Sequence, residues 1–100
     1  MNKRISKEVL RQLRNDIPID WLITSGIKIE HKHSEGHLRF LCPLCYEFNT
    51  ATKKEANLAR CFRCGKNFNP IDMVMTCSGL DFLETVRILI PVLEHFNGGK

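Results

Sequence analysis

Residues 40–75 read FLCPLCYEFNTATKKEANLARCFRCGKNFNPIDMVM, and this stretch decides the fold because it contains two Cys-x-x-Cys pairs. Cys42 and Cys45 form the first pair, Cys61 and Cys64 form the second, and 15 residues separate the two pairs. Two thiolates with two residues between them on a tight turn occupy two corners of a tetrahedron, and a second such turn supplies the other two. The sequence therefore predicts a zinc ribbon that holds one Zn²⁺ through four thiolates.

Each turn carries a residue that suits its shape. Pro43 stiffens the first turn, and Gly65 permits a positive φ directly after Cys64. Four thiolates complete the tetrahedron and leave no position for water or substrate, so the site is expected to be structural rather than catalytic.

Other kinds of site use the same residue types. A dithiol oxidoreductase also carries Cys-x-x-Cys, but no strand–helix unit surrounds either pair, so this alternative is disfavoured. His31, His33 and His37 lie close together in sequence and are the candidates for a second metal site; polar residues on an exposed hairpin are the favoured interpretation, because the cysteines already complete one tetrahedron. Cys77 is expected to be a small buried hydrophobe on a helix.

Length and composition describe one small globular domain. The chain has 100 residues, of which 43% are hydrophobic and 26% charged. No run approaches the roughly 18 apolar residues of a membrane span, and residues 1–6 do not open a signal peptide, so a cytoplasmic location is expected. In that reducing compartment, paired cysteines are metal ligands more often than disulfides.

The positive charge is concentrated in the zinc half of the chain. Residues 1–69 hold 13 lysines and arginines against 7 aspartates and glutamates, a balance of +6, whereas residues 70–100 have a balance of −2. Positive surface is expected of proteins that bind a phosphate backbone, and a solvated surface has the same composition.

Apolar spacing predicts an α+β fold, in which a zinc ribbon with a small antiparallel sheet is flanked by N-terminal and C-terminal helices. The expected organisation is a single domain over residues 1–100, with a helical lead-in over 1–26, the ribbon over 27–69 and the C-terminal helices over 70–97. In the lead-in, Ser6 caps a helix that ends near Ile17, and Pro18 begins a second helix with Gly26 at its C′ position.

The ribbon is expected to begin with a hairpin. Alternating residues predict a strand from Ile27 to Lys32, a turn at 34–36 and a second strand over 38–41. Residues 46–57 are expected to link the two cysteine pairs with polar turns, and residues 58–62 to form a strand.

Two helices are expected after the ribbon. Asn69 caps the first, which runs to Gly79, and Asp81 begins the second, which Pro91 kinks or breaks. Residues 97–100 are expected to fray. The apolar residues of the second helix expected to point inward are Phe82, Val86, Leu89, Ile90 and Leu93.

The order of these motifs resembles the N-terminal zinc-binding domain of bacterial-type DNA primases over about residues 3–90. The resemblance rests on Cys-Pro-Leu-Cys, Cys-Phe-Arg-Cys-Gly and the two helix signatures that begin at Ile71 and Phe82. Cys45 stands where the family usually has histidine, and the family's Glu-Lys-Thr-Pro-Ser-Phe segment is here 47–52, with only its glutamate shared. The resemblance implies a module that contacts single-stranded DNA template and helps initiate primers.

In such primases the polymerising domain is separate, and 100 residues leave no room for it. The resemblance therefore implies a non-enzymatic chain, which is a stand-alone relative, a truncated copy, or a partner that acts in trans with a catalytic primase or a helicase. A zinc ribbon that docks a protein partner or regulates it is the alternative.

Cations and aromatic residues cluster around the ribbon. Cations for phosphates beside aromatics for bases compose a single-strand binding surface, although Phe40 and Phe62 can equally shield the metal. The candidate nucleic-acid-binding residues are Arg39, Lys53, Lys54, Arg60, Phe62, Arg63 and Lys66.

Overall fold

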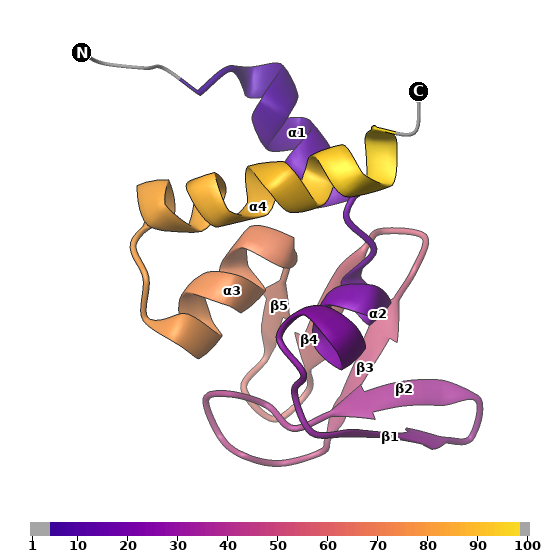
Figure 1. Ribbon diagram of the computed structural model, residues 1–100. Helices are drawn as coiled ribbons and strands as arrows, with labels where there is room; N and C mark the ends of the chain where they lie inside the picture. Colours follow the sequence, from indigo (N-terminus) through magenta and orange to yellow (C-terminus); the bar gives the residue numbers. More distant parts are fainter. Residues whose placement is uncertain (1–4, 99–100) are drawn as a thin grey trace.

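The structure, a computed structural model, describes residues 5–98, which form helices above two small sheets (Figure 1). The α+β class expected from the sequence is confirmed. Residues 1–4 and the expected frayed end at Gly99 and Lys100 lie outside the described residues. In chain order the elements are α1 (Lys7–Asn15), α2 (Ile19–Trp21), the π-helical turn η1 (Leu22–Gly26), β1 (His31–Ser34), β2 (His37–Phe40), β3 (Thr50–Lys53), β4 (Leu58–Cys61), β5 (Lys66–Phe68), α3 (Pro70–Ser78) and α4 (Phe82–Asn97).

Both sheets are antiparallel, one of order β1-β2 and one of order β3-β4-β5. The first is the expected hairpin, in which Ser34 pairs with His37 across a turn of two residues with positive φ, Glu35 and Gly36. The expected strand start at residue 27 is wrong. Lys28 has a φ of 65°, which interrupts the extended run before His31.

The second sheet contains two strands that the sequence analysis missed. β3 lies inside the segment expected to form only polar turns, and β5 follows the second cysteine pair. They are 4 and 3 residues long, respectively, too short for alternation to stand out. Their partner is β4, where Thr50 pairs with Cys61 and Phe68 pairs with Ala59.

The helix starts agree with the expected caps. The Ser6 hydroxyl accepts from the Val9 N–H at 3.0 Å, and capping boxes begin α3 at Asn69 and α4 at Asp81. Gly79 ends α3 with a φ of 75°, the left-handed conformation that glycine adopts readily.

Gly26 is not the C′ residue that was expected, because it lies within η1 and the left-handed position is Lys28. A Cβ on Gly26 would lie 3.0 Å from the Trp21 ring, so close packing explains the glycine.

The helix α4 runs through Pro91 without a break, so of the expected kink or break the break is wrong. Phe82, which was expected to point inward, is 40% exposed. Phe82 is the first residue of the helix and projects beyond the packed turns.

The core lies where α1, α3 and α4 pack together and continues down to the sheets (Figure 1). Trp21 packs edge-on against Phe96, with ring centroids 4.9 Å apart. Cys77 on α3 is half-buried, and burial raises the pKa of its thiol. Within residues 5–98, the helices are too short or too polar to cross a membrane.

Asn57 joins the β3–β4 turn to the helical lead-in. Its amide nitrogen donates to the carbonyls of Arg14 and Ile17, at 2.7 and 2.8 Å, and its oxygen accepts from the Ile19 N–H at 2.9 Å. Pro18 interrupts the helical hydrogen bonding between α1 and α2, so these backbone groups need a partner from elsewhere. Asn57 supplies it from a left-handed φ of 53°.

Replacing Asn57 with glycine is expected to lower the free energy of unfolding by about 1–3 kcal/mol, because three hydrogen bonds are lost while the positive φ is tolerated. Denaturant unfolding of the zinc-loaded protein measures the change. Asn57→Ala serves as the comparison and should be less stable still, since alanine adds a left-handed penalty of about 1–2 kcal/mol. Wild-type stability in the glycine variant would show that the three Asn57 hydrogen bonds contribute nothing to the free energy of unfolding.

Candidate metal centre

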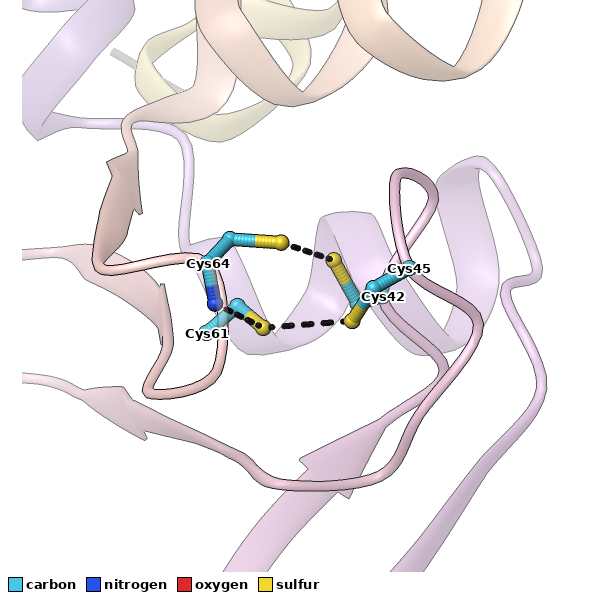
Figure 2. Close-up of side chains that lie close together, drawn as sticks. All are labelled: Cys42, Cys45, Cys61 and Cys64. Atoms are coloured by element: carbon cyan, nitrogen blue, oxygen red, sulfur yellow. Dashed lines mark hydrogen bonds between the residues drawn. The ribbon is translucent and has the colours of Figure 1, made fainter.

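The four paired cysteines come from two loops that the sheets hold face to face. Cys42 and Cys45 follow β2, whereas Cys61 ends β4 and Cys64 lies in the β4–β5 turn. Figure 2 shows the side chains of the two pairs pointing toward one another. All four sulfur atoms lie within 4.8 Å of one another, and none is in a disulfide.

The spacing of the sulfur atoms fits one zinc ion. The Cys42 and Cys64 sulfurs are 3.9 Å apart, and those of Cys45 and Cys61 are 3.6 Å apart. Tetrahedral zinc with Zn–S bonds of about 2.3 Å requires sulfur atoms about 3.8 Å apart. The donor set of four thiols and its dimensions therefore match a closed structural zinc site.

In each turn a backbone N–H donates to the first cysteine of the pair, from two residues later in the first turn and from three residues later in the second. The Leu44 N–H donates to the Cys42 sulfur, and the Cys64 N–H donates to the Cys61 sulfur, both at 3.4 Å. The residue after each pair has a positive φ, 65° at Gly65 and 60° at Tyr46. The conformation expected at Gly65 is confirmed, whereas Tyr46 was missed, since its residue type does not indicate a left-handed position.

The pKa values of the thiols of Cys61 and Cys64 are shifted in opposite directions. Burial raises the pKa of Cys61, but hydrogen bonds from the Cys64 N–H and the neighbouring thiols outweigh it and lower the pKa to about 7. The pKa of Cys64 is raised to about 12 by desolvation of its sulfur and by hydrogen bonds to the three other thiols; the sulfur points inward although the residue is exposed (Figure 2). Adding a second thiolate beside the first is unfavourable until a cation compensates the charge, so metal binding releases protons.

Comparison with known proteins places this site in a family. Residues 5–96 match the model of the CHC2 zinc finger family. The chain belongs to the CHC2 zinc finger family. It is 33% identical over 88 residues to the DNA primases of Listeria monocytogenes and Listeria innocua, an alignment that covers 84% of this chain and 13% of each primase.

The family assignment confirms the resemblance seen in the sequence, and with the sulfur geometry it supports one structural Zn²⁺. In this chain a cysteine, Cys45, occupies the second of the four ligand positions, where the family usually has histidine. The match lies within the zinc finger, and the chain spans about an eighth of the length of these primases.

The hairpin histidines do not form a second metal site. His31, His33 and His37 are all exposed, and within residues 5–98 the four cysteines are the one group of three or more possible ligands close enough to hold a metal ion. The structure thus agrees with the interpretation of these histidines as polar hairpin residues.

Three candidate nucleic-acid-binding residues, Lys53, Arg60 and Phe62, line one cavity on a face of the β3–β4–β5 sheet. On β4, Arg60 pairs with Asn67, and alternation places this pair on the opposite side from Cys61. A cavity of about 280 Å³ lies here, and we call this surface the outer sheet face. Residues lining the cavity include Thr52, Lys53, Leu58, Arg60, Phe62 and Asn67.

Phe62 and Arg60 form the centre of the outer sheet face. The Phe62 side chain is 52% exposed, and the Arg60 guanidinium carbon lies 5.7 Å from its ring centroid. Phe40, the other aromatic residue near the candidate cations, is fully buried and packs in the core.

The other candidates are dispersed. Lys66 pairs with Cys61 and its ammonium lies 5.5 Å from the Phe68 ring centroid, which places it on the opposite side of the sheet. Lys54 lies 3.7 Å from an Asp20 oxygen at the far end of the ribbon.

Arg39 donates to the Thr50 carbonyl and lies 3.7 Å from Glu35. Arg63 is exposed in the second cysteine turn.

Proposed function

We propose that this protein is a zinc-dependent module that binds single-stranded DNA template during primer initiation in DNA replication. All four paired cysteines are the zinc ligands in this proposal, and the outer sheet face is the binding surface. Support comes from the family, from two relatives named DNA primase and from the exposed Phe62–Arg60 pair.

The outer sheet face combines the two chemistries that single strands need. An exposed aromatic ring stacks on bases of any sequence, and arginine and lysine side chains attract the phosphates. Phe62 supplies the ring, and Arg60 and Lys53 supply the charge within the same cavity lining. The Arg60–Asn67 hydrogen bond, 3.0 Å long, holds the guanidinium in place before DNA binds.

Zinc has an indirect role in this function. A closed thiolate site offers no catalytic position, but it fixes the second cysteine turn, in which Phe62 directly follows Cys61. Metal binding and folding share one free energy, so the binding face exists only in the zinc-loaded protein.

In this proposal these residues bind the template, and primer synthesis is the work of a catalytic primase domain. The proposed partners are a catalytic primase or a helicase in the cytoplasm, where template DNA and reduced thiols occur together.

Replacing Arg60 with alanine is expected to weaken single-strand binding and to reduce the slope of log affinity against log salt by about 0.7, the value for one lost phosphate contact. Fluorescence anisotropy with a labelled single-stranded pool at low and moderate salt measures both, with a duplex as the comparison ligand. Lys66→Ala is the matched control, because it removes the same charge from the opposite side of the sheet.

Equal losses in the two variants would indicate diffuse attraction to a basic surface and refute the outer sheet face as the site. Absence of binding at micromolar protein would refute the function. The protein-interaction alternative would then gain weight, since α4 exposes about half of Leu83 and Ile88.

A further inference from the structure

The cavity on the outer sheet face has a directional hydrogen-bonding character that charge and stacking alone do not require. Arginine has donors and no acceptor, so the Arg60–Asn67 contact fixes the Asn67 oxygen toward the guanidinium. The Asn67 NH₂ group then faces away from Arg60 as a donor. The guanidinium carries five N–H donors, and this contact uses one of them.

The rest of the lining adds few acceptors. Lys53 adds a third donor group, Leu58 and Phe62 are apolar, and no lining residue of the cavity, all of them within residues 5–98, is acidic. Thr52 pairs with Ala59, and alternation turns its side chain to the opposite side of the sheet from Arg60. A ligand group that enters this cavity therefore meets donors from both Arg60 and Asn67 and an apolar wall beside them.

Resting on the proposed function, we infer that this cavity selects a keto base of single-stranded DNA through Arg60 and Asn67. Thymine and guanine present a carbonyl oxygen where cytosine and adenine present an amino group. The carbonyl accepts from the two donors, while an amino group in the same place leaves donors facing donors. The cavity of about 280 Å³ suits one base whose ring lies against Leu58 and Phe62.

The test uses two matched pairs of bases in which a keto group replaces the amino group, together with the proton on the adjacent ring nitrogen. Oligo(dU) is compared with oligo(dC), because uracil lacks the methyl group that further distinguishes thymine from cytosine, and a mixed strand containing hypoxanthine is compared with the same strand containing adenine, each about 12 nucleotides long. The zinc-loaded protein is expected to bind the keto member of each pair at least about fivefold more tightly, the lower end of discrimination by a bidentate contact.

Two variants link the preference to Asn67, which is exposed on β5. Asn67→Ala should reduce the preference while keeping salt-dependent binding, because the Arg60 donors remain, and Asn67→Asp should reverse it, because the carboxylate accepts from amino groups. Zinc content and thermal unfolding confirm that both variants are folded.

The possible failures are distinct. Wild-type binding that is equal for both members of each pair, or a preference that survives Asn67→Asp, would overturn the selection of a keto base and leave single-strand binding intact. Failure to bind any of the strands would overturn both proposals.

Discussion

Replacing Cys61 with serine is expected to release the zinc ion and to unfold the ribbon. Cys61 is fully buried at the end of β4, and its sulfur lies 3.6 Å from that of Cys45. Zinc binding in small structural sites contributes on the order of 10 kcal/mol at neutral pH, comparable to the total stability of about 5–15 kcal/mol of a typical domain. A serine hydroxyl cannot replace the thiolate, so the loss removes the main stabilising interaction of this region.

Zinc content per chain and the cooperativity of thermal unfolding measure this effect. Cys77→Ser is the matched control, because Cys77 lies on α3 outside the four-sulfur group and should keep one zinc ion per chain. A Cys61→Ser protein with full zinc content and wild-type unfolding would contradict the assignment of Cys61 as a ligand.

Replacing Thr50 with valine is expected to lower the free energy of unfolding by about 2–6 kcal/mol. The Thr50 hydroxyl donates to the Phe40 carbonyl at 2.7 Å and accepts from the Phe40 N–H at 2.8 Å, and both residues are fully buried. It thereby connects β2 to β3 as a backbone pair would. Valine keeps the shape but leaves two buried backbone groups without this partner, each at a penalty of about 1–3 kcal/mol.

Denaturant unfolding with excess zinc measures the change without interference from metal loss. Thr52→Val makes the same chemical change on the same strand at a half-buried position and should change stability by less than about 1 kcal/mol. If Thr50→Val were as stable as this control, the hydroxyl would not be what holds the two sheets together.

Features that depend on neighbouring residues were predicted from the sequence. The two Cys-x-x-Cys turns, the helix caps at Asn69 and Asp81 and the positive φ at Gly65 each depend on a few adjacent residues. The family resemblance, carried by the same local motifs, was also correct. Errors arose where a local pattern was overridden, as in the expected strand at Ile27, since Lys28 turns the chain there.

The sequence by itself determined that four cysteines would gather around one zinc ion, because paired spacing on tight turns leaves little geometric choice. Only the tertiary structure decided which cations share a face with Phe62, since β5 was not recognised and its register sets the sides of Arg60 and Lys66. Tertiary structure also decided the roles of Thr50 and Asn57, whose partners lie 10 to 43 residues away. A polar side chain carries no local signal of a distant backbone group that it will satisfy, because that partner exists only once the chain has folded.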